Sequence, residues 1–289
     1  MYETETGWIH QHVKNVISIE VVQDWAMSRV LRIHTTSGDL FFKSCTSLPL
    51  SANETRLTEF LAHLYPHNLP DLLAVDVEHG WMLLGDVGAN LRTEPHFEHW
   101  HEAVMRLAAI QHDSLAHLDQ LQAAGCPDRR AASLEARIET ILADDAMLSG
   151  LDAAEVDRLR SLAPRLRDRC QQLHRVTLTH GDVHGGNVGY KDGSPRFFDW
   201  SESCIAHPLY DLPVILRDTV AYFSPEQTAQ VRDDYLACWE DGQQQWQIVR
   251  PVAALHHGMM YNGVAEVVIP GQPRVRVAGW LRDILAYLQ

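Results

Sequence analysis

Residues 180–187 of this 289-residue chain read His-Gly-Asp-Val-His-Gly-Gly-Asn, and residues 196–200 read Arg-Phe-Phe-Asp-Trp. Short apolar runs lie on both sides of the first motif, at 176–179 and 188–190, and a Lys-Asp-Gly-Ser turn at 191–194 precedes the second motif. This pattern predicts a rigid loop held between short strands. The two motifs are therefore expected to lie close together in space.

The polar side chains that matter most in these motifs are Asp182, Asn187 and Asp199. Asp182 and Asn187 are five residues apart on the predicted loop, and Asp199 leaves the end of the next strand, where it can face the same cavity. Two carboxylates and an amide oxygen that converge suit Mg²⁺, which prefers oxygen ligands and takes the rest from phosphates and water. The arrangement predicts phosphoryl transfer.

The paired motifs resemble the catalytic loop and the metal-binding aspartate of the aminoglycoside phosphotransferase/choline kinase family. The members of this family are small-molecule relatives of the protein kinases, whose loop has the same Asp-x-x-x-x-Asn spacing. The resemblance implies that Asp182 is the catalytic base and that Asn187 and Asp199 bind Mg²⁺. It also implies that Asp211, in a Pro-Leu-Tyr-Asp-Leu segment, supports the catalytic loop together with His180.

Two other interpretations of the first motif follow from the residues alone. A Gly-Asp turn with an asparagine nearby is often only a loop, because these residues tolerate left-handed backbone and cap it. Residues 181–185, Gly-Asp-Val-His-Gly, also resemble the opening motif of two-metal phosphoesterases. That chemistry needs a later Gly-Asn-His and further histidine ligands in order, and the sequence does not supply them. The two motifs together favour the kinase-like interpretation.

Three strands are predicted near the amino terminus, at 16–22, 28–34 and 40–43. Lys43 ends the third of these strands. By itself it is a polar residue at an exposed strand end, but the family resemblance makes it the residue that binds the α- and β-phosphates of a nucleotide. The turn at 23–27, which should cover the phosphates, contains no glycine.

Ser28 follows that turn and is the residue we expect to contact the phosphates there, because related kinases often use a serine or asparagine at this place. The chain has neither a Walker A sequence nor a Gly-x-Gly-x-x-Gly loop. This departure leaves the choice of nucleotide open; by the resemblance ATP is expected, with GTP as the alternative.

A helix is predicted after Ser51-Ala52-Asn53-Glu54, which has the pattern of a capping box. The resemblance implies that an acidic residue on this helix pairs with Lys43. Glu54 fits the family register best, and Glu59 is the alternative if Glu54 only caps the helix.

Two further strands are predicted, near 72–75 and 81–84, and residues 84–88 form the crossing to the second part of the chain. The resemblance implies that backbone groups of this crossing, at Leu84 and Asp86, receive the adenine. Such recognition leaves almost no mark on the side chains.

From residue 95 onward the pattern is helical. Helices are predicted at 97–121, 132–142 and 152–173, and Pro164 should kink or split the last of these. Residues 212–289 are predicted to be mostly helical as well, with breaks at Gly263 and at Pro270-Gly271.

Composition excludes several classes of protein. The chain has 24 lysines and arginines against 38 acidic residues, a net charge of −14, which repels nucleic acid and anionic membranes. Its five cysteines are widely spaced and are expected to be free thiols. The amino terminus does not resemble a signal peptide, and no apolar run is long enough to span a bilayer, so a cytoplasmic location is expected.

These observations predict an α+β protein with a two-lobed, protein-kinase-like fold. Residues 1–84 are expected to form a nucleotide-binding lobe around a small antiparallel sheet, and residues 85–289 a mainly helical lobe with the catalytic loop and the acceptor site. The expected reaction transfers the γ-phosphoryl group of ATP or GTP to a hydroxyl group of a small molecule, with Mg²⁺ as cofactor.

The acceptor is expected to be a cation such as an aminoglycoside. The reason is that Asp233, Asp234, Glu240 and Asp241 alternate with tryptophans and tyrosines in the last helices, and this combination suits amine-bearing molecules. The alternatives are a metabolic kinase of an amino alcohol, amino acid or sugar, and a kinase-like binding protein without catalytic activity.

Overall fold

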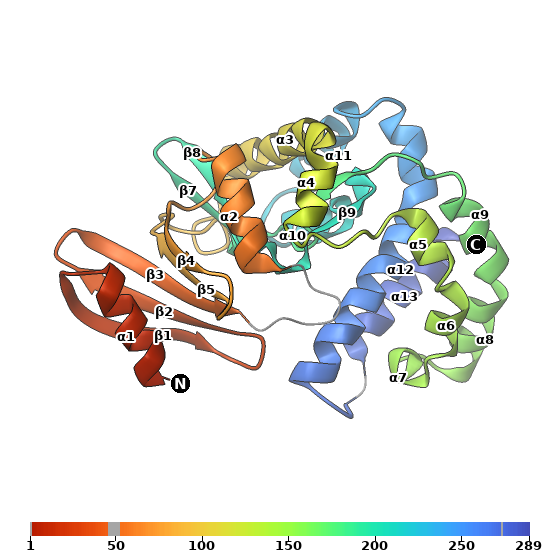
Figure 1. The fold of residues 1–289 in the computed structure, drawn as a ribbon. Helices are drawn as coiled ribbons and strands as arrows, with labels where there is room; N and C mark the ends of the chain where they lie inside the picture. The colour runs from red at the N-terminus through yellow and green to blue at the C-terminus, as the bar shows by residue number, and fades with distance from the viewer. Residues whose placement is uncertain (1, 46–52, 273) are drawn as a thin grey trace.

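The computed structural model of the chain describes residues 2–45, 53–272 and 274–289. A small sheet-based part comes first, and a larger, mainly helical part follows, with α2, α3 and the short strands β7 and β8 between the two in Figure 1. Within the described residues, no helix is both long enough and apolar enough to cross a membrane. All five cysteines are free thiols, as predicted.

The first part is a five-stranded antiparallel sheet in the order β1-β2-β3-β5-β4. All of its strands were predicted, although β1 and β3 extend further than expected. The elements of this part are α1 (Tyr2–His12), β1 (Val16–Asp24), β2 (Ser28–Thr35), β3 (Gly38–Cys45), α2 (Glu54–Leu64), β4 (Leu72–Asp76) and β5 (Trp81–Gly85).

Helix α1 was not predicted from the sequence. Ile9 of the helix and Val13 just after it pack in a small apolar core on one face of the sheet, which includes Leu31, Ile33 and Phe42. Most other residues of the helix are polar, so the helix has too few apolar positions to show a helical period. Tertiary contact with the sheet therefore determines this helix more than its own sequence pattern does.

Helix α2 connects the sheet to the helical part. The first two residues of the predicted capping box, Ser51 and Ala52, lie outside the described residues. Asn53 caps the helix, because its side chain accepts a hydrogen bond from the amide of Arg56 at 3.2 Å. The apolar face of α2, with Leu57 and Leu61, belongs to the large core of the helical part rather than to the small core under α1.

The second part is helical apart from two short two-stranded sheets, β6-β9 and β7-β8. Its elements are α3 (Phe97–Asp113), η1 (Ser114–His117), α4 (Leu118–Ala123), α5 (Ala131–Glu135), α6 (Ile138–Ala143), α7 (Asp145–Leu148), α8 (Ala153–Ser161), α9 (Ala163–Cys170), β6 (Thr177–Thr179), η2 (Gly185–Asn187), β7 (Val188–Lys191), β8 (Ser194–Phe197), η3 (Trp200–Glu202), β9 (Cys204–Ala206), η4 (Pro208–Tyr210), α10 (Leu212–Tyr222), α11 (Pro225–Ala237), α12 (Gly242–Val268) and α13 (Val275–Tyr287).

Two predicted helices are broken where a single helix was expected. The helix predicted at 97–121 changes at Ser114 into the 3₁₀ turn η1 before α4 begins. The Ser114 hydroxyl donates to the carbonyl of Gln111 at 2.7 Å and accepts from the amide of Leu178 at 2.9 Å, so it offers the backbone an alternative to continued helix. The helix predicted at 132–142 is likewise two short helices, α5 and α6.

The effects of proline and glycine on the later helices were predicted with mixed success. Pro164 does split the third predicted helix, and it lies in the first turn of α9, where its missing N–H costs nothing. Pro270-Gly271 lies between α12 and α13. The break predicted at Gly263 is wrong, because α12 continues through that residue to Val268. A single glycine costs a helix only about 1 kcal/mol, and α13 packs along α12.

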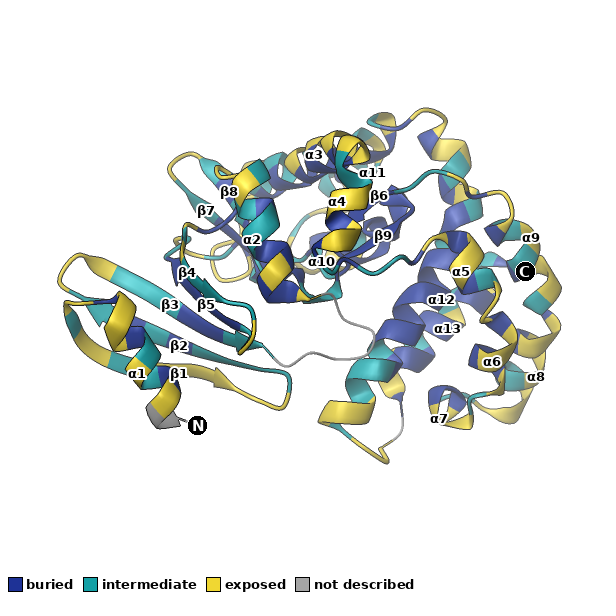
Figure 2. Cartoon of the chain, in the orientation of Figure 1, coloured by how far each residue is buried: buried dark blue, intermediate teal, exposed yellow. Residues whose placement is uncertain are grey.

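Figure 2 shows α12 as one of the most buried elements of the chain. It carries His256 and His257, which are buried with His207 and His180. His257 Nε2 lies 2.7 Å from the carbonyl oxygen of Tyr210 and its ring stacks on Trp280. Burial lowers the pKa of His180 and His257 to about 4 and that of His207 to about 3, and it also lowers the pKa of His256 well below its usual value. These side chains are neutral in the folded protein near neutral pH.

The buried histidines predict a pH-dependent stability that one variant can isolate. The unfolded chain protonates His257 with a pKa near 6.5, whereas the folded protein does so only near 4, so its contribution to stability is lost as pH falls between these values. His257→Gln keeps an N–H for the Tyr210 carbonyl but cannot titrate. Between about pH 7.5 and about pH 5.5, its free energy of unfolding should fall by about 1 kcal/mol less than that of the wild type.

Urea titrations of both proteins at the two pH values measure this difference, and the other titrating groups cancel in the comparison. An identical loss of stability in the two proteins would show that folding does not change the pKa of His257.

Candidate active site

A cavity of about 350 Å³ lies between the sheet and the helical part. Its lining comes from β1, β2, β3 and α2 on one side, from residues 85–90 at the back, and from Gly186, Asn187 and residues 198–200 on the other side. The predicted site residues in this lining are Ser28, Lys43, Glu54, Leu84, Asp86, Asn187 and Asp199. The described lining does not include His180 or Asp182, which precede Asn187 on the loop. It also does not include Asp211, which accepts hydrogen bonds from the loop backbone.

Lys43 lies between two carboxylates at the centre of the cavity. Its Nζ donates to Oε1 of Glu54 at 2.6 Å and lies 2.9 Å from Oδ1 of Asp199. Burial alone would lower the pKa of Lys43, but Asp199 and Glu54 outweigh burial and raise it. Of the two glutamates considered from the sequence, the structure pairs Glu54 with Lys43.

The pKa values of Glu54 and Asp199 shift in opposite directions. Burial raises the pKa of Glu54, and Lys43 only partly opposes this effect. Burial also acts to raise the pKa of Asp199, but the charge of Lys43 and the hydroxyl of Ser201 lower it overall. The Asp199 carboxylate therefore stays ionised. Its side chain is 36% exposed, so its oxygen atoms are open to the cavity.

Asp211 holds the start of the catalytic loop from below. Its completely buried carboxylate accepts the backbone amides of His180 at 3.0 Å and Gly181 at 2.8 Å, and the side-chain amide of Gln111 at 2.9 Å. Burial raises the pKa of Asp211 to about 7, against the opposing effect of these N–H donors. The loop backbone is thus fixed by an acceptor that cannot be reached by water.

Gly181 turns the chain at this point with φ of 86°, in the left-handed region. A side chain here would place its Cβ 2.3 Å from the carbonyl oxygen of Glu202. Only glycine fits both the backbone angle and the close contact. Asp182 follows directly after this turn, whose backbone amides at His180 and Gly181 are bound by Asp211.

Asp182 lies among three polar side chains. One carboxylate oxygen is 3.5 Å from the hydroxyl of Tyr261, and the other is 3.4 Å from Nε2 of His184 and 3.5 Å from Nδ2 of Asn187. The Asn187 amide nitrogen also donates to the Asp182 carbonyl at 3.0 Å, so its oxygen points to the other side of the group. The side-chain N–H of Asn187 therefore faces Asp182, and its side-chain oxygen faces away from Asp182.

Two hydrogen-bond contacts, one between backbone groups and one from a histidine side chain, connect the two motifs. The amide of Phe198 donates to the carbonyl of Asn187 at 3.0 Å, and His180 Nε2 lies 3.2 Å from the carbonyl of Phe198. Asp199 then takes left-handed backbone angles, φ 64° and ψ 62°, which are uncommon for a residue other than glycine. Such local strain is typical of functional positions that their surroundings hold in place.

The crossing between the two parts packs directly on β7. Asn90 and Gly189 form a β-bridge, and a Cβ on Gly189 would lie 2.5 Å from the carbonyl oxygen of Val87. Lys191 donates to the carbonyl of Asp86 at 2.7 Å. The crossing and the catalytic loop are therefore placed relative to each other by the same strand.

Sequence analysis missed two residues that support the loop. Gln111 was counted only as part of a helix, yet it is completely buried and joins Asp211 to α3. It lies on the apolar face of that helix, four residues after Leu107, so a polar residue at a core position was the available signal. Asp218 accepts the amide of Gly185 at 2.7 Å, and no pattern in the sequence indicated this contact.

The acidic residues that favoured a cationic acceptor pair with neighbouring side chains or lie far along α12 from Tyr261, and the cationic acceptor stays a prediction. Asp233 pairs with its neighbour Arg232, and Asp234 pairs with His101. Asp241 precedes the start of α12, whereas Tyr261 contacts Asp182 from the other half of that helix, roughly 30 Å further along. Sequence order alone did not show which end of α12 faces the loop.

Taken together, a sheet with a paired lysine, a crossing segment and a fixed Asp-x-x-x-x-Asn loop define the kinase-like class of small-molecule phosphotransferases. Residues 18–252 match the sequence model of the phosphotransferase enzyme family, and the chain belongs to this family. No curated protein sequence matches the chain significantly. The resemblance and the two-lobed α+β fold predicted from the motifs are confirmed.

Solved structures with the same fold act on different molecules. The choline kinase of Streptococcus pneumoniae has a TM-score of 0.64 at 14% identity, with 98% of this chain and 99% of that chain covered. A macrolide 2′-phosphotransferase of Brachybacterium faecium has a TM-score of 0.61 at 16% identity, with 99% and 97% covered. A spectinomycin phosphotransferase bound to ADP and spectinomycin has a TM-score of 0.58 at 12% identity, with 98% and 93% covered.

The close contact at Gly181 generates a prediction about the loop. Gly181→Ala should destabilise the protein by about 2 kcal/mol or more, because the new Cβ meets the Glu202 carbonyl and the backbone angle becomes strained. It should also abolish nucleotide turnover. Gly193→Ala is the matched control, since Gly193 has φ of 73° but nothing within 4 Å of its Cβ position.

The control should lose about 1 kcal/mol from backbone strain alone and keep its turnover. Denaturant unfolding and nucleotide consumption test both variants. Equal effects of the two substitutions would contradict a specific role for the close contact at Gly181.

Proposed function

We propose that the protein transfers the γ-phosphoryl group of ATP to a hydroxyl group of a small molecule, with GTP as the alternative donor. The observation that carries this proposal is the cluster of Lys43, Glu54 and Asp199, which shares one cavity with Asn187. Asp182 precedes Asn187 on the same loop, and a carboxylate oxygen of Asp182 lies 3.5 Å from Nδ2 of Asn187. A phosphate group in the cavity would then meet Lys43, while an acceptor hydroxyl would meet Asp182.

Mg²⁺ fits the donors that line the cavity. Asn187 and Asp199 would hold it, with an amide oxygen and a carboxylate that Lys43 and the Ser201 hydroxyl keep ionised against the effect of burial. The described residues contain no cluster of three or more His, Cys, Asp or Glu side chains able to bind a metal. The oxygen atoms of Asn187 and Asp199 suit Mg²⁺, which usually binds through one or two protein carboxylates and completes its shell with phosphate oxygens and water. When bound, the ion would offset negative charge on the phosphates.

The residues of the chain would act mainly through position and charge. Phosphoryl transfer needs the reacting oxygen atoms held in line and the developing negative charge neutralised. Lys43 is fixed by two carboxylates and can provide charge without reorganising. Asp182 would accept a hydrogen bond from the acceptor hydroxyl and finally its proton. Asp211 would act on Asp182 only by holding the loop backbone.

The aromatic side chains near Asp182 bear on the acceptor. The Arg217 guanidinium lies over the Trp280 ring, 3.2 Å from its centre, and is also paired with Asp283. Tyr261 packs near the same tryptophan. A quaternary ammonium acceptor would find this aromatic face already covered by a cation of the chain. This arrangement supports a polyhydroxylated acceptor, such as an aminoglycoside or a sugar, over choline, with an amino acid or another amino alcohol as further alternatives.

A screen for acceptor-stimulated nucleotide consumption tests the proposal directly. Aminoglycosides, sugars, homoserine and choline would be offered with MgATP and with MgGTP. Stimulation by a hydroxylated molecule supports the proposal, and its phosphorylated product identifies the acceptor. A protein that binds MgATP yet consumes none with any acceptor would instead fit a kinase-like binding protein.

Asp182→Asn should lower turnover by about 10²- to 10⁴-fold while nucleotide affinity stays unchanged, because an amide has the shape of the carboxylate but cannot accept the proton. Turnover is measured with the acceptor found in the screen, and nucleotide affinity by calorimetry. Asp192→Asn, in the exposed turn after β7, is the matched control and should behave as the wild type. Wild-type turnover in Asp182→Asn would remove Asp182 from the role of base.

Asp199→Ala should remove the effect of Mg²⁺ on ADP affinity, because the metal would lose its carboxylate ligand. In the absence of metal, the variant should bind ADP at least as tightly as the wild type, since Lys43 is no longer paired with Asp199. Calorimetric titrations with and without Mg²⁺ measure both effects. If Mg²⁺ strengthened ADP binding equally in the variant and the wild type, the metal would not be held by Asp199.

A further inference from the structure

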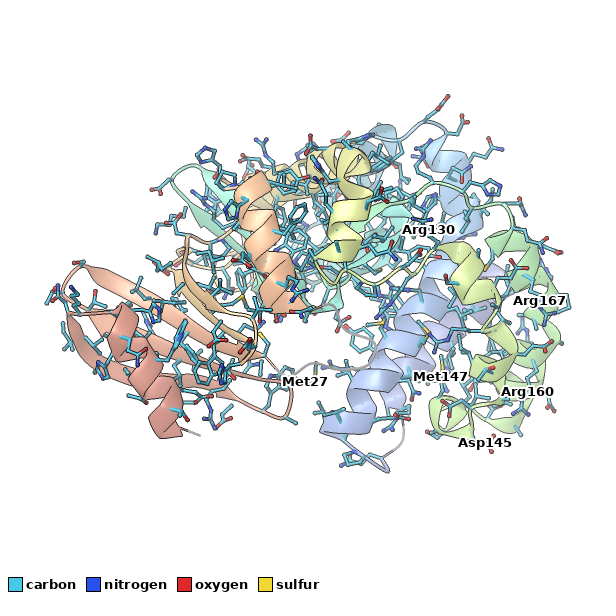
Figure 3. All side chains as sticks on the ribbon, in the orientation of Figure 1. Met27, Arg130, Asp145, Met147, Arg160 and Arg167 are labelled. Atoms are coloured by element: carbon cyan, nitrogen blue, oxygen red, sulfur yellow. The ribbon has the colours of Figure 1, made fainter. Side chains whose placement is uncertain are left out.

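The turn between β1 and β2 covers one end of the cavity without a glycine. Trp25, Ala26 and Met27 form it, and the amide of Trp25 donates to the carbonyl of Ser28 at 3.1 Å. Figure 3 labels Met27 at the tip of this hairpin, at the end of the sheet that faces the helical part. Glycine-rich turns bind phosphates with several backbone amides. This turn has to provide its donors by another route.

The Ser28 hydroxyl is held by two N–H donors. The indole Nε1 of Trp25 donates to Oγ of Ser28 at 2.8 Å, and the side-chain amide of Gln23 donates to the same oxygen at 3.3 Å. A serine hydroxyl has two lone pairs and one hydrogen, and a tryptophan indole can only donate. Both lone pairs of Ser28 are therefore occupied. Among the described residues its hydrogen has no acceptor, so it is available to a ligand.

The free hydrogen belongs to a residue that lines the cavity. Gln23 and Ser28 form the wall on the side of the sheet, and Gly186, Asn187 and Asp199 form the wall across from it. In the described lining Lys43 is the one cation, and it already faces two carboxylates. A nucleotide diphosphate or triphosphate brings more negative charge than this lysine offsets. An additional hydrogen-bond donor at this wall would be favourable.

Trp25 is placed as a polar contact rather than as part of a core. Its side chain is 47% exposed, in contrast to Trp81 of β5, which is buried. A tryptophan on a turn tip has little apolar surface to bury, so packing does not explain its position. Its indole N–H is nevertheless committed to Ser28.

We propose that Trp25 and Gln23 are positioning residues that direct the Ser28 hydroxyl hydrogen to a nucleotide phosphate beyond the first. The inference rests on the proposed function, because it requires a nucleotide in this cavity. In this turn the hydrogen-bond donor is a hydroxyl group that two side chains orient. In glycine-rich turns the donors are backbone amides. Trp25 acts only through Ser28 and does not itself contact the nucleotide.

A double-mutant cycle with calorimetry tests this proposal, using ADP, with AMP as the ligand that lacks the second phosphate. Ser28→Ala should weaken ADP binding by about tenfold, and Trp25→Phe, which keeps an aromatic ring but loses the N–H, by about threefold. The double variant should bind ADP no more weakly than Ser28→Ala, because Trp25 has no other route to the ligand. Gln23→Leu should behave as Trp25→Phe does.

The controls separate a positioning role from a structural one. AMP affinity and the thermal unfolding midpoint should be the same in the wild type and the variants. Ser37→Ala, which removes a hydroxyl from the next hairpin turn, should not change ADP affinity. If Trp25→Phe weakens ADP binding as much in the Ser28→Ala background as in the wild type, the proposal is overturned.

The outcomes also distinguish this proposal from the proposed function. Wild-type protein that does not bind ADP would refute the nucleotide site itself. Wild-type protein that binds ADP, together with variants that bind it equally well, would refute only the role of Trp25, Gln23 and Ser28.

Discussion

The ion cluster of Lys43 with Glu54 and Asp199 is the interaction on which the site depends, because it joins three elements that are far apart in the sequence. Lys43 is on β3, Glu54 begins α2, and Asp199 follows β8. Lys43 and Glu54 are almost completely buried, and a buried charge is tolerated only when it is paired and hydrogen-bonded. The cluster has one cation and two carboxylates, which burial should make unfavourable. The raised pKa of Glu54 reflects this imbalance, and a cation bound at Asp199 would relieve it. The pair of Lys43 and Asp199 therefore links the two parts of the chain, and the excess carboxylate leaves the cavity with a negative charge that the proposed metal ion would offset.

The catalytic loop depends on a different kind of support. Asp211 binds two successive backbone amides of the loop, and Gln111 fixes Asp211 in turn. Asp218 holds a third loop amide at Gly185. The loop is thus held by buried or partly buried side chains of α3, of α10 and of Asp211 just before α10. Loss of Asp182 and loss of Gly181 should consequently differ in kind, since the first removes a chemical group and the second the backbone geometry that presents it.

The sequence allowed prediction of those features that depend on a few residues close together. The loop at 180–187, the aspartate at 199 and the sheet of the first part all follow from local patterns, and Lys43 and Glu54 followed from the family resemblance. Features that depend on tertiary packing could not be predicted in this way. Helix α1 exists because the sheet offers Ile9 and Val13 a surface, and the supporting roles of Gln111 and Asp218 require knowledge of which helix passes under the loop. The ion-pair partners of the acidic residues near 233–241 could not be predicted for the same reason, because their charge is visible in the sequence but their neighbours in space are not.

This difference also explains why the chemistry of the chain is better determined than its acceptor. The proposed chemistry uses Lys43, Asp182, Asn187 and Asp199, and structures at 12–16% identity that share this fold bear the names of kinases for choline, a macrolide and spectinomycin. The acceptor must instead fit surfaces near Asp182 that come from distant helices, where Tyr261 and Trp280 belong to α12 and α13. In this chain Arg217 covers the Trp280 ring. A single arginine on α10 therefore changes the character of that aromatic surface without altering any residue of the catalytic loop. Selection for a new acceptor can act on such helical positions while the buried ion cluster and the loop supports stay the same.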